Sequence, residues 1–69
     1  MMIAVTYRNA LGELGQVAGV DTSILVLSDG RRMHFSDALA AAASLVGAPL
    51  LLSGGGSAPI TGIEDVTPP

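Results

Sequence analysis

The first residues of the chain alternate between apolar and small or polar side chains. From Met2 to Arg8 every second residue is large and apolar or aromatic, and this period of two predicts a half-buried β-strand. After turn-forming residues at 9–12, the segment Leu14–Val20 is also predicted as a strand. The glycines inside this second strand indicate a bulge or the close approach of another backbone.

The segment from Ser23 to Ser36 predicts a β-hairpin. An apolar run with β-branched residues precedes Asp29-Gly30, and alternating residues follow it. Asp-Gly favours a two-residue type I′ loop, because both of its central residues need positive φ. In that register one face is apolar (Ile24, Val26, Met33 and Phe35), and the other is mixed (Leu25, Leu27, Arg32 and His34).

A single alanine-rich helix is predicted from Ser36 to Val46. Ser36 is a suitable N-cap, and Asp37 lies in the first turn, where the helix dipole favours an anion. Gly47 is placed to end the helix in a left-handed conformation, and Pro49 prevents its continuation.

This helix has no charged face beyond its first turn. Its expected core-facing stripe has spacings of three and four residues (Leu39, Ala42, Ala43 and Val46). The rest of its surface is also apolar or small, which is typical of a helix buried on all sides. A chain of this size cannot enclose a helix, so we expect a partner to cover it. The alternative is that the alanines are exposed, since alanine is the best helix former.

The C-terminal quarter is predicted to be extended. Leu50–Ser53 has the pattern of a short strand, residues 54–59 have the composition of a flexible linker, and Ile60–Val66 has weak strand character. The expected fold is therefore α+β, with an antiparallel sheet of about four strands, one alanine-rich helix and an extended Gly/Pro-rich C-terminal tail. Residues 1–53 would form the module and residues 54–69 an arm.

Length and composition indicate that the module needs support from other chains. A domain of 69 residues buries only about 60% of the surface of its unfolded chain. It has no cysteine and a single histidine, so neither disulfides nor a cysteine zinc site can supplement the core. Charged residues make up only 13% of the chain, about half of the ~25% typical of soluble domains. Oligomerisation or docking onto a partner is the remaining route to stability.

Charge and hydropathy argue against nucleic acid and membrane partners. The net charge is −3, and three arginines cannot provide the basic patch that phosphate binding needs. No apolar run approaches the ~20 residues of a spanning helix. No basic region precedes the N-terminal apolar residues, so we expect no signal peptide and a virion or cytoplasmic location.

No residue pattern predicts catalysis or cofactor binding. His34 stands alone on the mixed face of the hairpin, and the acidic residues fit turn, helix-start, loop and tail positions (Asp21, Asp29, Asp37, Glu64 and Asp65). The glycine triplet at 54–56 lacks the lysine and following helix of a phosphate-binding loop. We therefore expect no catalytic, cofactor-binding or metal-binding residues, no small-molecule substrate and no enzymatic activity.

Two short segments resemble a known family. Val20–Val26 is similar to the opening strand of PIN-domain ribonucleases, the toxins of toxin–antitoxin pairs, and Asp37–Ala41 with Gly47–Leu51 resembles the late helix and strand of that family. The resemblance implies a metal-dependent ribonuclease in which Asp21 and Asp37 bind the metal. It covers under half of the chain, and the acidic residue that the family has after the late strand is absent.

These patterns favour a non-enzymatic structural or accessory subunit of a large assembly. A phage or viral particle fits best, with the chain as a capsid decoration protein or minor virion protein. The alternatives are a small adaptor or regulatory protein that binds one protein partner and, third, a degenerate PIN-like ribonuclease. Residues of the helix and the arm are predicted to bind the neighbouring subunits (Ala38, Ala41, Leu45, Ile60, Ile63 and Val66).

Overall fold

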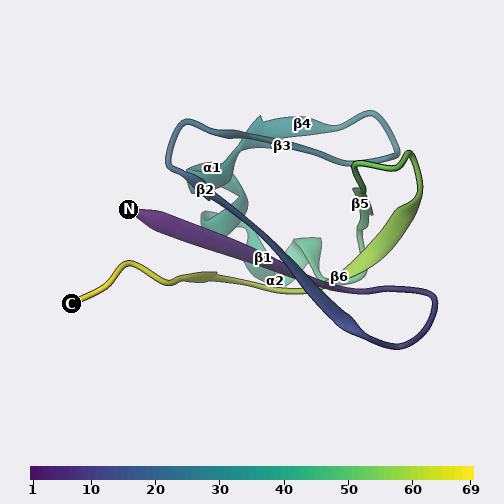
Figure 1. Ribbon diagram of the computed structural model, residues 1–69. Helices are drawn as coiled ribbons and strands as arrows, with labels where there is room; N and C mark the ends of the chain where they lie inside the picture. The colour runs from purple at the N-terminus through teal and green to yellow at the C-terminus, as the bar shows by residue number, and fades with distance from the viewer.

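The protein is mostly β, with 48% of its residues in strands and 14% in helices. The computed structural model describes residues 1–69 (Figure 1). Its strands are β1 (Met2–Arg8), β2 (Leu14–Val20), β3 (Ile24–Val26), β4 (Arg32–His34), β5 (Pro49–Leu51) and β6 (Ser57–Asp65), and its two short helices are α1 (Phe35–Ala40) and α2 (Ala42–Leu45). The expected α+β fold with one helix and an extended tail is therefore wrong.

Four strands form one curled antiparallel sheet in the order β2-β1-β6-β5. The remaining pair, β3 and β4, forms a separate two-stranded sheet. An isolated bridge between Leu27 and Leu50 joins the two sheets, and the Ser28 N–H donates to the Pro49 carbonyl at 2.8 Å. The result is a half-barrel, which Figure 1 shows with the β3–β4 hairpin across from β1 and β2.

The curl of the large sheet originates in β6. The register between β1 and β6 shifts between Thr6 and Tyr7, because β6 contains an extra residue there. Such a bulge bends a strand and increases its twist. The Thr61 hydroxyl donates to the Thr6 carbonyl at 3.2 Å and holds the bulge. The first part of β6 pairs with β5 and the rest with β1, so one strand belongs to both halves of the curled sheet.

The core lies on the concave side of the half-barrel, between the two sheets and the helices. It contains only apolar side chains, and no polar or charged residue is buried. Its members come from nearly every element (Ile3, Val5, Leu25, Leu27, Phe35, Ala38, Leu45, Ala48, Leu50, Ile60 and Ile63). β2 and β4 contribute no fully buried residue, and their Val17 and Met33 pack against the core while only partly buried.

The first two strands are confirmed with the predicted bounds. They pair from Met2 opposite Val20 to Arg8 opposite Leu14. The loop between them is closed by Asn9, whose side-chain Oδ1 accepts hydrogen bonds from the N–H groups of Leu11 and Glu13. An asparagine that satisfies local backbone donors in this way is a common turn device.

The hairpin is confirmed at the predicted place, but its register was wrong by one residue. Its loop has three residues, 28–30, since the Leu27 N–H donates to the Arg31 carbonyl. Within this loop only Gly30, at φ 98°, has positive φ. A one-residue shift exchanges the two faces of a strand. Leu25 and Leu27 are therefore buried, whereas Ile24 lies opposite exposed His34 and Val26 opposite Arg32.

The predicted helix is two helices, separated at Ala41 with φ −102° and ψ 19°. The residue preceding the first helix is His34 rather than Ser36, and it makes no side-chain cap. The buried side chains are Phe35, Ala38 and Leu45, not the expected stripe, of which Ala43 and Val46 are exposed. The large Phe35 ring enters the core and thereby sets which side of the following turns faces inward. Gly47 has the positive φ expected at the helix end.

The C-terminal arm expected at residues 54–69 is largely a strand of the chain's own sheet. Residues 57–65 form β6 between β1 and β5, and only the last four residues extend beyond it. Ala58, Ile60 and Ile63 of this strand are buried. The preceding strand begins at Pro49, one residue before the expected start at Leu50.

Candidate functional site

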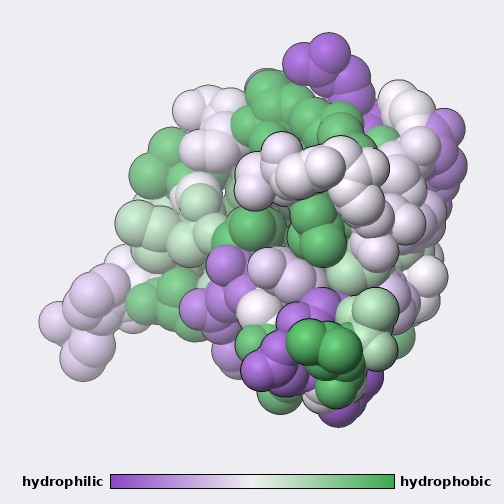
Figure 2. Space-filling view, turned by 45° about the vertical axis from the view of Figure 1, so that its right-hand side comes forward, coloured by the Kyte–Doolittle hydropathy of each residue, from purple (hydrophilic) through white to green (hydrophobic).

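The main hollow of the molecule is an open apolar groove between β2, β3 and β5. Its volume is about 510 Å³, and eight of its ten lining residues are hydrophobic. Figure 2 shows apolar side chains around a hollow on this face of the molecule. The lining residues are Val17, Ile24, Leu25, Val26, Phe35, Leu50, Leu51, Leu52, Ser53 and Gly55.

On the side of β2, Val17 is the one residue that lines the groove. The inward residues of β2 are Gly15, Val17 and Gly19. The Tyr7 ring lies where a Cβ of Gly15 would be, and Ser23 and Phe35 crowd the corresponding position at Gly19. Only Val17 therefore fills the middle of β2, and the space across from β3 and β5 stays open to solvent.

A second hollow, of about 280 Å³, lies beside the β3–β4 hairpin. His34, Arg32 and Asp37 line it together with Ile24 and Met33. The side chains of His34, Arg32 and Asp37 are exposed. No group of three or more His, Cys, Asp or Glu residues is placed to hold a metal ion, and neither helix has the length and hydropathy to cross a membrane.

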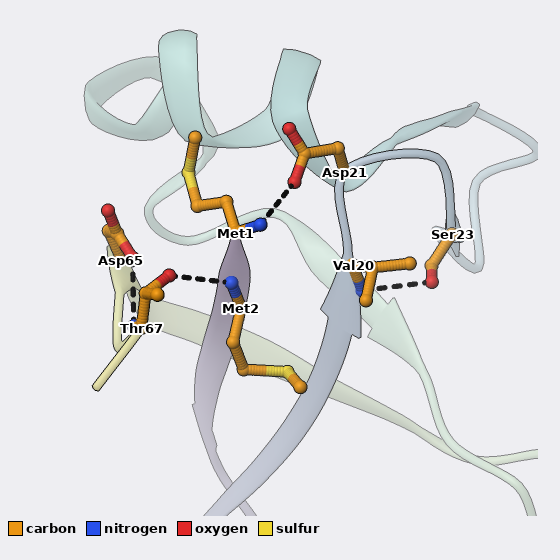
Figure 3. A network of polar contacts seen from close by, with 7 residues as sticks. All are labelled: Met1, Met2, Val20, Asp21, Ser23, Asp65 and Thr67. Carbon is orange, nitrogen blue, oxygen red and sulfur yellow. Dashed lines mark hydrogen bonds and ion pairs between the residues drawn. The ribbon is translucent and has the colours of Figure 1, made fainter. Parts of the chain in front are cut away.

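A polar network closes one end of the half-barrel (Figure 3). The Met1 amino group forms an ion pair with Asp21 Oδ1 at 3.1 Å, and that oxygen is shielded from solvent. The Met2 N–H donates to Thr67 Oγ1 at 2.7 Å, and the Thr67 N–H donates to Asp65 at 2.9 Å. These contacts connect the start of β1, the turn after β2 and the end of β6, so the network has a structural role.

Two carboxylates of the chain have lowered pKa values. Hydrogen bonds from the side chain and backbone of Thr67 lower the pKa of Asp65, and those from Arg31 lower the pKa of Asp29. Asp29 also forms an ion pair with Arg31 at 2.8 Å within the hairpin loop. Both carboxylates are held in the ionised form, which suits structural contacts and not proton transfer at neutral pH.

The six residues predicted to bind a partner fall into two groups. Ala38, Leu45, Ile60 and Ile63 are buried by the chain's own core, and so present no free surface in this fold. Ala41 and Val66 are exposed, and their binding to a partner stays a prediction. The sequence analysis missed Val17, Ile24 and Leu51 of the groove. Gly15 and Gly19 each lie two residues from Val17, so all three share one face of the strand. This spacing was the sequence signal that could have pointed to Val17.

Comparison with known proteins gives no relative: no family model, curated protein or solved structure matches this chain. The segment between Asp21 and Asp37, the two residues to which the PIN resemblance gives a metal-binding role, contains β3 and β4. Asp21 pairs with the Met1 amino group, and Asp37 lies in the first turn of α1.

Proposed function

We propose that the chain is a non-enzymatic structural or accessory subunit that binds other protein chains in a larger assembly. The observation that carries this proposal is the amount of apolar side-chain surface left uncovered. Nine large hydrophobic residues are exposed (Met1, Met2, Leu11, Leu14, Val20, Ile24, Val46, Leu51 and Val66), against nine charged residues in the whole chain. Contiguous exposed apolar surface commonly marks an interface.

Several of these residues are neighbours in space. Ile24 and Leu51 line the groove, while Met2 and Val20 lie opposite each other on the outer face of the large sheet. A particle such as a phage or viral capsid would cover both regions with neighbouring subunits. A capsid decoration protein or minor virion protein is therefore the setting we propose.

A small adaptor is the second candidate, and the groove favours it. Its volume of about 510 Å³ lies within the ~300–1,000 Å³ typical of binding sites, and its lining is mainly apolar. An adaptor would use it to bind the side chains of one protein partner.

The first prediction concerns the purified chain. We expect concentration-dependent self-association in size-exclusion chromatography with light scattering, on a sample whose circular dichroism shows a folded β protein. The exposed apolar residues supply the driving force, since each Å² of buried apolar surface contributes about 25 cal/mol. A folded chain that stays monomeric at every accessible concentration would contradict the assembly proposal and favour the adaptor.

A further inference from the structure

The loop of the β3–β4 hairpin contains the one place in the chain where glycine follows an aspartate or asparagine, Asp29-Gly30. The backbone nitrogen of a residue after aspartate can attack the side-chain Cγ without an enzyme. Glycine permits this best, because it has no side chain to shield its nitrogen. The dipeptide is therefore a candidate site of spontaneous chemical modification.

The reaction has two steps and needs only water. First a bond forms between the glycine nitrogen and Cγ, and the Cγ–OH group leaves as water together with the proton of the nitrogen. Water then opens the five-membered ring at either carbonyl. Opening at the side-chain carbonyl restores aspartate, whereas opening at the backbone carbonyl gives isoaspartate, in which the main chain runs through Cγ. The composition of the chain is unchanged.

The loop is open to water and uncrowded. Ser28, Asp29 and Gly30 are all exposed. Apart from its two chain neighbours, no residue has an atom within 4 Å of the place where a Cβ of Gly30 would be. Crowding therefore gives no protection to this dipeptide, and any protection must come from contacts of the reacting groups themselves.

Both oxygens of the Asp29 carboxylate are engaged by Arg31. Oδ1 accepts a hydrogen bond from the Arg31 N–H at 3.1 Å. Oδ2 accepts one from Arg31 Nε at 2.9 Å and lies 2.8 Å from a second guanidinium nitrogen. The hydrogen bonds from the side chain and backbone of Arg31 lower the pKa of Asp29. Ring closure proceeds through the neutral acid, because an ionised carboxylate is a poor electrophile, so these contacts oppose it.

The nitrogen that would attack is also held. The Gly30 N–H donates to the Leu27 carbonyl at 3.1 Å. Ring closure takes the nitrogen out of the plane of its peptide group and removes its proton, so this hydrogen bond must break. The folded loop therefore restrains both reacting groups.

We propose that Asp29-Gly30 is a site of spontaneous isoaspartate formation that the folded loop suppresses, with the Arg31 side chain as its protecting group. Neither step of the reaction involves another chain, so this protection is independent of the proposed assembly.

The position of the loop gives the modification a structural effect. Leu27, directly before the loop, is buried and forms the bridge to Leu50 that joins the two sheets. The Leu27 N–H donates to the Arg31 carbonyl across the loop. Isoaspartate adds one carbon atom to the main chain between these two residues. We expect the added length to disturb the closing hydrogen bond and the register that it maintains.

The expected protection by Arg31 is modest. The side chains of Arg31 and Asp29 are 51% and 39% exposed, and exposed ion pairs are weak. We expect removal of the Arg31 side chain to speed isoaspartate formation by roughly two- to fivefold at about pH 5, where the carboxylate is mostly ionised. This ratio should fall towards one as the pH drops through the pKa of Asp29, because the neutral acid then predominates with or without Arg31.

Ageing of the full chain at about pH 5 measures the reaction. The samples are wild type, Arg31→Ala and the matched control Arg32→Ala, which removes an exposed arginine that has no ion pair with Asp29. Wild type in concentrated guanidinium chloride gives the rate without the fold. Peptide mass spectrometry with fragment ions that distinguish isoaspartate from aspartate gives the rate at residue 29, and circular dichroism verifies that the other samples are folded.

We expect the denatured chain to react fastest, Arg31→Ala to exceed folded wild type and Arg32→Ala to match it. Added salt screens an exposed ion pair, so it should speed the reaction of folded wild type and leave Arg31→Ala unchanged, a comparison that needs no substitution in the wild-type sample. Equal rates of wild type and Arg31→Ala, or equal acceleration by both arginine variants, would overturn the role of Arg31. Equal rates in folded and denatured wild type would overturn suppression by the loop.

Discussion

At the scale of single residues, the two glycines on the concave face of β2 determine how closely the half-barrel closes. A Cβ at Gly19 would lie 2.8 Å from the Ser23 Cβ and 3.2 Å from a Phe35 ring carbon. Phe35 is buried and cannot move away without disturbing the core. A Cβ at Gly15 meets the outer end of the Tyr7 ring, which is only half-buried and can swing outward.

We expect Gly19→Ala to lower the free energy of unfolding by about 1–3 kcal/mol, the usual cost of overpacking. Gly62→Ala is the matched control, because Gly62 lies in β6 with open space at its Cβ and no positive φ. Urea unfolding followed by circular dichroism gives both values. Equal stability of the two variants would show that the contact between Gly19 and Phe35 is loose.

The Asp65 carboxylate links stability to pH. Its pKa in the folded protein is lowered from 3.8 by hydrogen bonds from Thr67. A lowered pKa gives stability that is present above the unfolded value and lost as pH falls through the folded value. We expect the melting temperature of wild type to fall more steeply below about pH 4 than that of Asp65→Asn. The difference in melting temperature should be small because the Asp65 carboxylate is exposed. If the melting temperatures of the two proteins fall in parallel with pH, the contact between Asp65 and Thr67 contributes nothing to stability.

At the scale of elements, the β3–β4 hairpin shows how one residue of register decides which side chains form the core. Leu25 is 2% exposed and its neighbour Ile24 is 46% exposed. We expect Leu25→Ala to cost about 2–5 kcal/mol of stability, as other large-to-small core changes do. Ile24→Ala should cost less than about 1 kcal/mol, because most surface changes have small effects. Denaturant unfolding of both variants measures the two losses of stability. A larger loss for Ile24→Ala than for Leu25→Ala would support the register with a two-residue loop.

The strands of the first hairpin could be predicted because their alternation is local and strict. The register of the second hairpin could not be predicted in this way, because its first residues, 24–27, are apolar on both faces in sequence. The contact of Leu27 with Leu50, 23 positions later, is what selects the buried face. The buried side of the helix was predicted wrongly for a related reason. Phe35 was assigned to the hairpin, although it is the first buried residue of α1.

The last strand was hidden by composition. Gly54, Gly55 and Gly56, followed closely by Pro59, are typical of a linker, yet Pro59 lies within β6 opposite Pro49 of β5. A proline has no N–H group to donate to a neighbouring strand. It is tolerated at these two positions because the pairing of β5 with β6 needs no N–H donor from either residue. Ala58 and Ile60 face the core on either side of Pro59 and were the signal for a strand.

At the scale of the whole molecule, the groove could not be predicted from the sequence. It depends on the bulge near Thr61, which curls the sheet without closing it into a barrel. Composition indicates that the chain has too few charged residues to form the surface of a soluble monomer. That a partner covers its apolar surface stays a prediction. The structure changes the location of this apolar surface, since the exposed large apolar residues are spread over β1, β2, β3, β5 and the connecting and terminal segments, and only Val46 adjoins a helix.

The position of β6 has a consequence for the order in which the fold can form. Ile3 and Asp65 are paired, so β1 and β6 can complete their pairing only after residue 65 has been synthesised. High contact order of this kind slows folding, because a long loop must close before the contacts that reward it. Before β6 has joined the sheet, β1 has β2 as its one partner strand, and the edge of β1 that β6 covers is open. The chain is then most vulnerable to misassociation in the interval before its last strand arrives.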